Sequence, residues 1–523
     1  MLRIRQIKLP INHNEHDLKN KITRKLNIKE KDIIDFQLNK QSIDARDKTN
    51  LMYVYEIDVN IKNEEKILKK HLKDVLKTPD ETYHLPKSGS LTLNHRIIIV
   101  GSGPAGLFAG YMLAKAGYKP LIIERGEDID SRVKTVEKFW ETGILNPNSN
   151  VQFGAGGAGT FSDGKLNTGN KDNRVKEVFR TFVKHGAPKD ILYLNKPHIG
   201  TDLLRDVIKN MINEIINMGG NIKYNTCLTN IITKDNKLTN IEINNQEIIS
   251  CENLILALGH SSRDTFEMLL NKGVKISPKP FAVGIRIQHS QNLINQSRYG
   301  HNLALPPASY KLTYQTFQKR GVYSFCMCPG GYVVNASSEK NMLAINGMSN
   351  YKRDSENANS AIIVTISPDD YGHNPLDGIN FQRKLEKKAY EIGNGKIPTQ
   401  LFKDFVKNKP SKEFNSVNPI FKGKYELTNI RDIFPPYIVE ALTEGIKHFD
   451  KTIKGFADGD AILSAVESRT SSPIKIERDE NFVSNIKGIY PCGEGAGYSG
   501  GITTSAIDGI KIAETIIKTY KPF

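Results

Sequence analysis

The sequence predicts an α/β fold in which a parallel sheet with a β-meander carries an inserted α+β domain and follows a small N-terminal α+β domain. One observation is the succession of a buried strand, a glycine-rich turn and a helix at residues 97–117. A second is a run of short strands with Asp-Asn and Asn-Asn turns at residues 222–258. A third is a strand, a glycine turn and a helix near the C-terminus, after a long segment of mixed strands. Helices that alternate with buried strands are typical of parallel sheets.

Length and composition place the chain among ordinary globular proteins. It has 523 residues, 38% hydrophobic and 25% charged, enough for two or three domains with their own cores. No apolar run approaches the roughly 18 residues of a membrane span, and the N-terminus MLRIRQIKLP lacks the apolar stretch of a signal peptide. The five cysteines are an odd number without the spacing of a disulfide framework. We therefore expect a cytoplasmic protein with no membrane partner and no metal site.

The net charge of +16 allows two interpretations. The 73 lysines and arginines could attract RNA or a phosphorylated cofactor. Because they are scattered, without a block of five or six, we expect most of them to lie on solvated faces. Nucleic-acid binding is therefore the less favoured interpretation.

Residues 1–90 are predicted to form a ferredoxin-like α+β domain followed by a linker. The predicted elements are a strand at Leu2–Lys8, a helix at Glu15–Leu26, strands at Ile33–Leu38 and Met52–Ile61, and a helix from Glu64. In the first helix Leu18, Ile22 and Leu26 share one face, and MYVYEIDVNI alternates as a strand does. The following stretch, TPDETYHLPKSGSLTLNH, is rich in residues that favour loops.

The motif G-x-G-x-x-G occurs three times, and only its first copy, VGSGPAG, has the context of a dinucleotide-binding turn. A strand precedes it, a helix follows it, and a second strand leads to Glu124, about twenty residues further on. Gly101 makes the tight turn, Gly103 lets the backbone approach a pyrophosphate, and Gly106 lets helix and strand pack closely. The helix N-terminus offers free N–H groups to phosphate, and Glu124 can accept hydrogen bonds from the adenosine ribose.

The second copy, GAGGAG at Gly154, lacks this context. Loop residues (NPNSN) precede it, and no strand with a terminal acid follows at the required distance. A backbone with almost no side chains from Gly154 to Gly159 can lie directly against a flat ring; a merely tight turn is the alternative. We therefore expect a bulky residue at Gly103 to abolish nucleotide binding, and one at Gly154 to leave it largely intact.

The third copy, GEGAGYSG at Gly493, follows a strand and precedes a helix predicted over Thr503–Ile517. In flavoproteins with one dinucleotide fold, such a segment returns to the sheet beside the first motif. Its acid, here Glu494, then meets the ribitol–pyrophosphate region, and the helix N-terminus points to the flavin ring. The third copy is thus predicted to close over the cofactor.

The middle of the chain supports one dinucleotide fold and not two. A helix is predicted over Thr201–Met218, then the meander, then a buried strand at Leu254–Leu258. A dedicated NAD(P)H domain would need a second unit of strand, glycine turn, helix and acid. Residues 276–454 contain no such unit and carry mixed strands with many prolines and glycines. They are predicted to form a substrate cap, so NAD(P)H would have to dock in the cleft over the flavin.

Six motifs spread over the chain carry a resemblance to a known family. They are KQSIDARDK at Lys40, GGAGTFSDGKL at Gly156, ALGHSSRDTF at Ala257, FCMCPGGYVVNASSE at Phe325, VESRTSSPI at Val466 and GEGAGYSGGITTSAIDG at Gly493. In these motifs the chain resembles the uncharacterised bacterial FAD-dependent dehydrogenases of the glutathione-reductase-like flavoprotein superfamily. The resemblance implies FAD, a two-domain flavoprotein body with a Rossmann-like sheet, and an appended N-terminal domain. It implies no substrate, because none is firmly assigned to that family.

On this interpretation the chain divides into four segments. Residues 1–90 are the N-terminal domain and linker, 91–275 the first part of the FAD domain, 276–454 the cap, and 455–523 the C-terminal part of the FAD domain. The predicted FAD-binding residues are Gly101, Ser102, Gly103, Pro104, Ala105, Gly106, Glu124, Arg125, Arg132, Gly157, Gly159, Thr160, Leu228, Ala257, Gly259, Gly493, Glu494, Gly501, Ile502 and Thr503.

Three side chains are candidates for catalysis: His260, Arg263 and Lys165. His260 follows a strand at its carboxyl end, where α/β sheets place ligands, although a histidine in a turn often only satisfies backbone groups. Arg263 could bind an anionic substrate or a phosphate, or cap the following helix, and Arg469 has similar alternatives. Lys165 and Asp163 follow the glycine loop and can face the ring.

Cys326 and Cys328 invite comparison with flavin-dependent disulfide reductases, whose redox cysteines lie further apart in sequence and early in the FAD domain. Here one residue separates the two cysteines, within the predicted cap, and an internal disulfide would be strained. A redox role is therefore disfavoured, and Cys492 is expected to be packed rather than reactive. The D-G motif after Ala457 lies too near the C-terminus for a hydroxylase, and a halogenase needs a tryptophan motif where this chain has only Trp140.

The sequence thus predicts an FAD-dependent oxidoreductase that transfers hydride between an unknown small molecule and FAD. Two alternatives stay open: a flavoprotein that binds or acts on RNA, and a redox-sensing protein with structural FAD. Any reduction by NAD(P)H should be weak and salt-sensitive, because side chains such as Arg263 and Lys165 would have to hold its phosphates.

Overall fold

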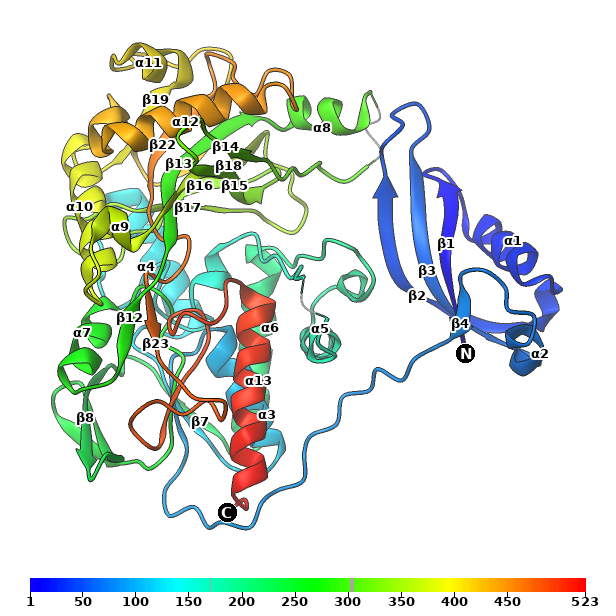
Figure 1. The fold of residues 1–523 in the computed structure, drawn as a ribbon, viewed down its shortest axis with the longest axis horizontal. Helices are drawn as coiled ribbons and strands as arrows, with labels where there is room; N and C mark the ends of the chain where they lie inside the picture. Colours follow the sequence, from blue (N-terminus) through cyan, green and yellow to red (C-terminus); the bar gives the residue numbers. More distant parts are fainter. Residues whose placement is uncertain (170, 302–304) are drawn as a thin grey trace.

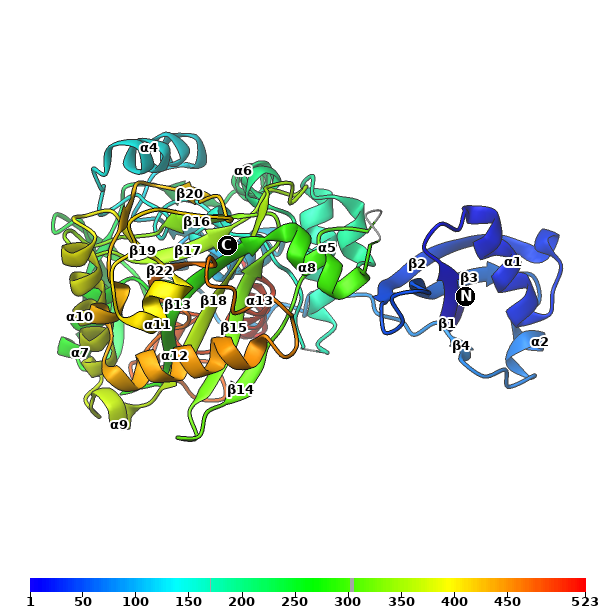
Figure 2. The same cartoon turned by 90° about the horizontal axis from the view of Figure 1, so that it is seen from above.

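The computed structural model describes residues 1–169, 171–301 and 305–523. Figure 1 shows a large body with a small N-terminal module to one side of it. In the view from above, the module stands beside α5 (Arg174–Lys184) and α8 (Gln291–Tyr299) of the body (Figure 2). The linker between them, residues 78–95, runs extended and pairs with the C-terminal segment, Leu91 with Tyr520.

The N-terminal module is an antiparallel sheet of four strands with its two helices packed on the sheet. Its elements are β1 (Leu2–Pro10), α1 (Glu15–Leu26), β2 (Ile33–Asp44), β3 (Met52–Ile61), α2 (Glu64–Leu68) and β4 (Val75–Lys77). The strand order β2-β3-β1-β4 is that of a ferredoxin-like fold, as predicted. Asn14 caps α1, and Leu18, Ile22 and Leu26 are buried against the strands. β1 and β2 run further than predicted because their ends stay paired with β3.

The body is organised around five parallel strands in the order β24-β11-β5-β6-β7. They are β5 (Ile98–Val100), β6 (Leu121–Ile123), β7 (Asn221–Lys223), β11 (Leu254–Leu256) and β24 (Ile489–Pro491). β5, β6 and β11 consist of isoleucine, leucine and valine alone and are buried on both faces, as parallel strands are. On β5, Ile99 packs against helices on one face, whereas Ile98 and Val100 pack against the meander on the other. The parallel sheet predicted from the sequence is thus confirmed.

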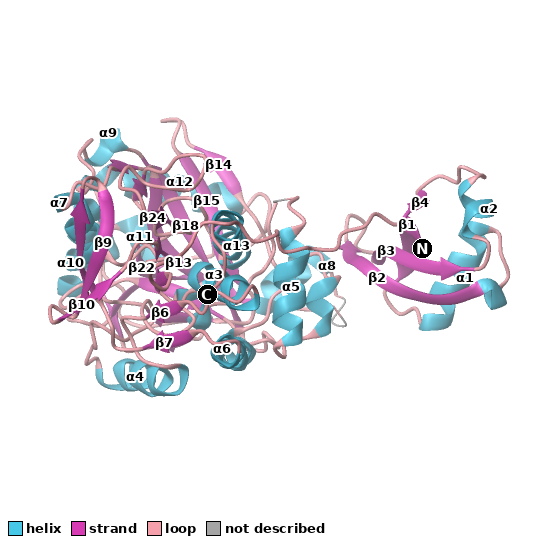
Figure 3. Ribbon diagram, turned by 90° about the horizontal axis from the view of Figure 1, so that it is seen from below, coloured by secondary structure: helices cyan, strands magenta, loops and turns pink. Residues whose placement is uncertain are grey.

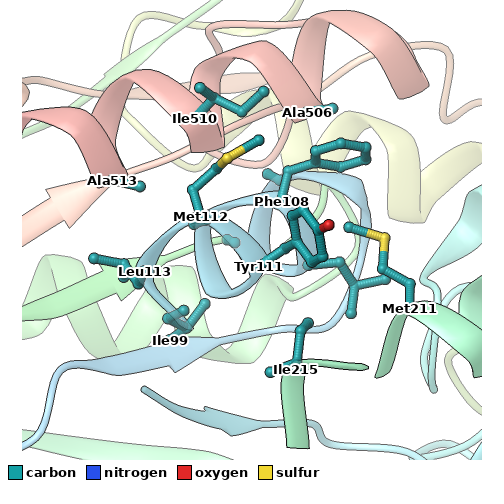
Figure 4. Close-up of a cluster of buried hydrophobic side chains, with 14 of the residues drawn as sticks. Ile99, Phe108, Tyr111, Met112, Leu113, Met211, Ile215, Ala506, Ile510 and Ala513 are labelled. Carbon is teal, nitrogen blue, oxygen red and sulfur yellow. The ribbon is translucent and has the colours of Figure 1, made fainter. Parts of the chain in front are cut away.

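Two layers cover this sheet. On one face lie α3 (Pro104–Lys115), α5, α6 (Thr201–Asn217) and α13 (Ile502–Thr519). In Figure 4 Met112 of α3 reaches towards Ile510 of α13, while Tyr111 lies beside Met211 of α6. The other face carries the meander β8 (Leu228–Lys234), β9 (Lys237–Ile243) and β10 (Glu247–Ser250), together with α7 (Arg263–Asn271). α4 (Ile129–Thr142) follows β6 along the chain.

The inserted domain is built on a seven-stranded sheet in the order β14-β15-β18-β13-β22-β19-β21. Its strands are β13 (Phe281–Ser290), β14 (Thr313–Gln315), β15 (Gly321–Cys328), β18 (Asn357–Ile366), β19 (Ile397–Leu401), β21 (Tyr425–Leu427) and β22 (Ile462–Glu467). Figure 3 shows the long strands β13, β15 and β18 next to one another. A smaller sheet holds β16 (Tyr332–Asn335), β17 (Ile345–Met348) and β20 (Phe421–Lys422). The helices of this domain are α8, α9 (Pro368–Tyr371), α10 (Asp377–Ile392), α11 (Phe402–Lys407) and α12 (Pro436–Phe449).

The chain enters and leaves the inserted domain through β12 (Ile276–Pro278) and β23 (Ile474–Ile476), which pair with each other. The expected boundary at residue 455 falls before β22, which nevertheless lies inside the large sheet between β13 and β19. This pairing joins strands that are far apart in sequence, so local patterns did not reveal it. The chain returns to the parallel sheet after β22 and not before it.

Candidate functional site

A cavity of about 570 Å³ lies at the carboxyl edge of the parallel sheet. The residues that directly follow β5, β6, β11 and β24 line it, namely Gly101, Glu124, Ala257 and Cys492. The opposite wall comes from the inserted domain, with Phe325 on β15 and Arg353 in a loop. Open α/β sheets bind their ligands at this edge.

The first glycine turn has the geometry that a dinucleotide requires. Gly101 has a φ of +99°, and a Cβ there would lie 2.3 Å from the carbonyl oxygen of Ala257. A Cβ at Gly106 would lie 1.9 Å from the carbonyl oxygen of Gly101, so helix and strand meet closely. At Gly103, by contrast, the nearest atom is the Cα of Gly157, 3.8 Å away. The backbone is therefore open to a ligand at Gly103 and closed at the other two positions.

Glu124 joins the first glycine turn to the second glycine loop. Its Oε2 accepts hydrogen bonds from the backbone N and the hydroxyl of Ser102, at 2.9 and 2.6 Å. Its Oε1 accepts hydrogen bonds from the backbone N of Gly126 and of Gly154, each at 3.0 Å. The carboxylate lines the cavity, where the ribose was expected, but the link to Gly154 was missed. That link joins residues 30 apart and no local signal shows it.

Arg125, beside Glu124, lies with its guanidinium 4.7 Å from the centre of the Phe153 ring. The same guanidinium donates hydrogen bonds to Asp264 and to Thr265, at 2.8 and 3.0 Å. Arg125 and Phe153 both line the cavity, so the first turn, the second loop and the start of α7 meet at this end.

Arg132 was predicted to contact FAD, and the structure corrects this. The side chain is fully buried and does not belong to the cavity wall. It donates hydrogen bonds to the carbonyl oxygens of Asn150, Val151, Ala155 and Gly157 at 2.7–3.0 Å. Burial lowers its pKa to about 9. Arg132 therefore holds the second glycine loop in shape through its carbonyl groups, and the loop, not Arg132, faces the cavity.

Gly154 is also more constrained than its sequence context suggested. It has a φ of +121°, and a Cβ there would lie 2.3 Å from Cδ of Arg132. A bulky residue at Gly154 would displace Arg132 and the loop, so the structure gives a reason to expect weaker nucleotide binding, where the sequence suggested that binding would stay largely intact.

The third glycine motif brings the N-terminus of α13 to the cavity. Gly500 and Gly501 have no atom within 4 Å of the position that a Cβ would take, and Glu494 and Ile502 also form part of the wall. Burial raises the pKa of Glu494 to about 7, although Lys279 lowers it. Open space beside a helix N-terminus fits an electron-rich group.

The cavity wall contains most, but not all, of the predicted cofactor residues. On the wall lie Gly101, Gly103, Pro104, Ala105, Glu124, Arg125, Gly157, Gly159, Leu228, Ala257, Gly259, Glu494, Gly501 and Ile502. Behind it lie Ser102, Gly106, Arg132, Thr160, Gly493 and Thr503.

The residues behind the wall hold its turns in place through hydrogen bonds of their own, and their contact with FAD stays a prediction. Gly493 donates its N–H to Asp508 at 2.7 Å. The hydroxyl of Thr503 donates to the carbonyl of Leu166 at 2.7 Å, and the carbonyl of Thr160 accepts from the hydroxyl of Thr201.

His260 lines the cavity as a neutral side chain. Burial, with Arg469 and Arg263 nearby, lowers its pKa to about 3. Arg469 donates to the hydroxyl oxygen of Ser261 at 3.1 Å, and the same hydroxyl lies 2.9 Å from Nδ1 of His260. Because a neutral imidazole carries one ring proton, His260 can donate one hydrogen bond and accept another.

Arg263 does not face the cavity, which corrects its predicted catalytic role. It is 1% exposed and donates hydrogen bonds to both oxygens of Glu386, at 2.9 and 2.8 Å, and to Gln382 at 2.9 Å. Arg469 donates to the same carboxylate at 2.9 and 2.8 Å. Neither the helix-capping nor the anion-binding alternative for Arg263 holds, because a buried acid on α10 occupies its guanidinium.

Lys165 and Asp163 do lie on the wall, together with Arg353 and Lys196, which sequence reasoning missed. Arg353 donates from Nε to Asp163 at 3.0 Å, and Nζ of Lys165 lies 3.2 Å from the same carboxylate. Although burial alone would raise it, these two cations lower the pKa of Asp163 to about 2. No motif marks Arg353 or Lys196, since only the fold brings them to Asp163.

Cys326 and Cys328 carry free thiols. Both line the cavity, and Cys326 has a φ of +42° where β15 bulges away from β18. Desolvation raises the pKa of Cys326 to about 12, so its thiol is protonated at neutral pH. Cys492 is buried, as expected, and also reaches the wall.

Residues 1–169, 171–301 and 305–523 hold neither a cluster of metal-ligating side chains nor a helix suited to cross a membrane. Within these ranges no three His, Cys, Asp or Glu side chains gather in a way that could hold a metal ion. No helix among them has the length and hydropathy of a membrane crossing.

Comparison with known proteins identifies related domains along the chain. A family model described as "FAD-dependent protein, C-terminal domain-like" matches residues 280–470, and one for an NAD(P)-binding Rossmann-like domain matches residues 99–180. A domain of unknown function matches residues 1–60. A protein of Clostridium beijerinckii described as uncharacterised is 48% identical over 528 residues, 99% of each chain.

Solved structures resemble the chain more distantly. Glycine oxidase from Bacillus cereus is 12% identical, with 82% of this chain and 98% of that one covered and a TM-score of 0.36. L-proline dehydrogenase from P. horikoshii is 13% identical, with 83% and 94% covered and a TM-score of 0.34. Both TM-scores lie below 0.5, so these likenesses do not bear on function.

Proposed function

This chain belongs to the family of FAD-dependent proteins that includes the Clostridium beijerinckii relative, with FAD as its cofactor, and we propose that it is an oxidoreductase that transfers hydride between a small molecule and the flavin. The observation that carries the proposal is one continuous cavity, walled by all three glycine motifs on one side and by the inserted domain on the other. A substrate held against the inserted domain would share this cavity with the cofactor.

The residues present fit FAD. Space for a ligand is open beside Gly103, Gly500 and Gly501, three backbone positions where a Cβ would point into the cavity or into free space. Gly103 is the N-cap of α3 and Gly501 the N-cap of α13, so both helices direct N–H groups there. Glu124 and Arg125 follow the second strand, where a ribose is bound in dinucleotide folds.

The protein's part in the reaction is binding, orientation and electrostatics. FAD, when bound, supplies the hydride acceptor or donor. The N-terminus of α13 presents partial positive charge to the cavity, and His260 presents a neutral imidazole there. The side-chain nitrogen of Lys165 lies next to the carboxylate of Asp163. The inserted domain closes the cavity on the other side and limits the access of water.

We further propose that the chain is related to the glutathione-reductase-like flavoproteins. The support is topological: a meander is inserted between β7 and β11, and the last strand, β24, pairs with β11 beside the first glycine turn.

We propose that NAD(P)H, if it reacts, enters the same cavity as the substrate. In the described part of the chain the parallel strands of the body form one five-stranded sheet, and the remaining sheets are antiparallel or mixed. We expect weak reduction that falls with ionic strength and that a substrate analogue blocks competitively. Stopped-flow reduction across salt concentrations measures this. Tight, salt-insensitive binding of NADPH together with the analogue would show a separate nicotinamide site.

The RNA-binding alternative gains no support from the N-terminal module. Arg3 and Arg5 lie on the face of the sheet opposite the helices, and both are paired, with Asp58 and Glu56. The aromatic side chain Tyr55 is buried on the other face, away from any base that could stack on it.

The test of the proposed function is to mix the purified protein anaerobically with a metabolite library. Reduction of the flavin is measured as bleaching of its visible absorbance. Cofactor released by denaturation is identified by chromatography. We expect FAD, and bleaching by at least one metabolite. A flavin that stays oxidised with every metabolite, yet is reduced by dithionite, would favour the redox-sensing alternative.

A further inference from the structure

We propose that the cavity binds an anionic group of the substrate, a carboxylate or a phosphate, through Lys165, Lys196 and Arg353. The inference rests on the proposed function, because it assumes that the substrate lies in this cavity. We call these three residues the cation cluster.

Two members of the cation cluster share a single carboxylate. Asp163 is 3% exposed and accepts a hydrogen bond from Nε of Arg353 at 3.0 Å. Nζ of Lys165 lies 3.2 Å from the same carboxylate and also donates to the carbonyl of Met327 on β15. One negative charge therefore faces two positive charges, and the acid is the most deeply buried of the three.

Lys196 adds a third cation without a carboxylate. Its Nζ donates to the hydroxyl of Ser309 at 3.0 Å, and within the described ranges no acid lies in ion-pair distance of it. Lys196 is exposed, and desolvation lowers its pKa, followed by the positive charges of Arg298, Arg353 and Lys165, since nearby like charges disfavour the charged form. Such crowding costs free energy that a bound anion would recover.

Three other acids lie on the wall: Glu124, Glu467 and Glu494. Burial raises the pKa of Glu494 to about 7, which reduces its negative charge at neutral pH. Glu467 pairs with buried Arg286 at 2.8 Å. Glu124 accepts hydrogen bonds from Ser102, Gly126 and Gly154 at the first glycine turn. The excess positive charge is therefore local to the cation cluster.

The position of the cluster favours the substrate over the pyrophosphate of FAD. Asp163 and Lys165 directly follow the second glycine loop, the segment predicted to lie against the ring, and Lys165 reaches across to β15 of the inserted domain. The pyrophosphate is expected at Gly103, which lies against Gly157 of the second glycine loop and does not reach β15. An anion held at the cluster would lie between the ring-facing loop and the cap.

The experiment titrates the FAD-containing protein with benzoate, with its neutral isostere benzamide and with inorganic phosphate, and follows the visible spectrum of the flavin. We expect at least one anion to shift the spectrum in a saturable way, and benzamide to bind at least about tenfold more weakly than benzoate if the group is a carboxylate. A response to phosphate alone would identify a phosphate. Benzamide binding as well as benzoate, with no response to phosphate, would overturn the inference.

Variants separate the cluster from general charge effects. Lys196→Met should weaken anion binding at least about tenfold. Lys189→Met removes the same charge from an exposed residue off the cavity wall and should leave affinity unchanged. Equal effects of both substitutions would overturn the inference, as would loss of FAD from Lys196→Met with unchanged anion affinity in the remaining holoprotein. A wild-type protein without FAD would instead overturn the proposed function, and the inference with it.

Discussion

Gly103 is the residue at which the first glycine turn leaves room for a ligand, and Gly154 is the residue at which the second loop has none. The difference lies in what each backbone meets. Gly103 is extended, with a φ of −71°, and faces open space, whereas Gly154 has a positive φ and lies against Arg132. The two glycines come from two copies of the same motif and have different roles. Gly103 leaves space for the cofactor, whereas Gly154 allows the second glycine loop to pack against Arg132.

We expect Gly103→Val and Gly154→Val both to lose FAD, for different reasons. Valine at Gly103 fills the space of the pyrophosphate without straining the chain, so the apoprotein should melt near the wild-type temperature. Valine at Gly154 requires an unfavourable φ and displaces Arg132, which should cost roughly 1–3 kcal/mol or more. Released flavin and thermal melting of the apoproteins measure the two effects. Normal FAD content in Gly154→Val would contradict the assigned role of the loop.

His289, near the end of β13, predicts a pH dependence of stability. It is 1% exposed, bonds through Nε2 to the carbonyl of Phe456 at 2.8 Å, and burial lowers its pKa to about 4. Because its pKa is lower in the folded state than its ordinary 6.5, unfolding takes up a proton between these pH values. Its contribution to stability is complete above about pH 6.5 and is lost as the pH falls towards 4, at about 1.4 kcal/mol per pH unit.

The test compares urea unfolding of the wild type and His289→Gln at pH 7 and pH 5. Glutamine can still donate to the carbonyl of Phe456 but does not titrate, so the variant should lose less stability on acidification. Parallel losses in the two proteins would assign the pH dependence to other groups.

At the scale of elements, a buried ion cluster joins α7 of the FAD part to α10 of the inserted domain. Arg263 on α7 and Arg469 after β22 both donate to Glu386 on α10. Although burial would raise it, the two arginines hold the pKa of Glu386 well below its usual range. Arg469 of the cluster also bonds to Ser261, whose hydroxyl contacts Nδ1 of His260, so the packing of two elements holds the histidine at the cavity wall.

Glu386→Gln should destabilise the protein by about 3–5 kcal/mol, because it removes the fully buried carboxylate that both arginines share. Their remaining counter-charge is the partly exposed Glu339. Glu391→Gln, on the same helix, is the matched control. Its carboxylate is exposed and 3.9 Å from Lys387, so the change should cost at most about 0.5 kcal/mol. Chemical denaturation measures both. Equal, small effects would show that the cluster does not hold the two elements together.

At the scale of the whole molecule, the N-terminal module docks next to the cation cluster of the cavity. The backbone N–H of Gln41 on β2 donates to the carbonyl of Tyr193 at 2.7 Å, and its carbonyl accepts from Asn195 at 2.9 Å. The residue that follows Asn195 in the chain is Lys196 of the cation cluster. Glu81, at the start of the linker, pairs with Lys176 on α5. The module therefore supports the segment that carries one wall of the cavity.

Gln41→Pro should release the module without unfolding it. β2 is an edge strand, where proline is tolerated, but the substitution removes the N–H that reaches Tyr193. We expect a larger radius of gyration in X-ray scattering, faster proteolysis within residues 78–95 and an unchanged FAD content. A scattering curve identical to that of the wild type would mean that other contacts hold the module.

The amino-acid sequence by itself determined the elements and the turns of this protein. The helix at Glu15–Leu26, the strand at Met52–Ile61 and the first glycine turn follow from interactions between neighbours in the chain: apolar periodicity, a helix cap and the freedom of glycine. Of the predicted cofactor residues, those in or beside a glycine turn largely reached the cavity wall for this reason.

Only the tertiary structure decided the roles of the long side chains. Arg132, Arg263, Arg353 and Lys196 are alike in sequence, each a basic residue in or beside a helix or loop. Packing buried Arg132 under a loop, buried Arg263 against Glu386, and brought Arg353 and Lys196 to the cavity. A charged side chain takes its role from the partner it meets, and the partners of Arg263 and Arg353 lie 123 and 190 residues away. A local sequence pattern does not show which residues so far apart in the chain come into contact. The cation cluster is therefore visible only in the tertiary structure.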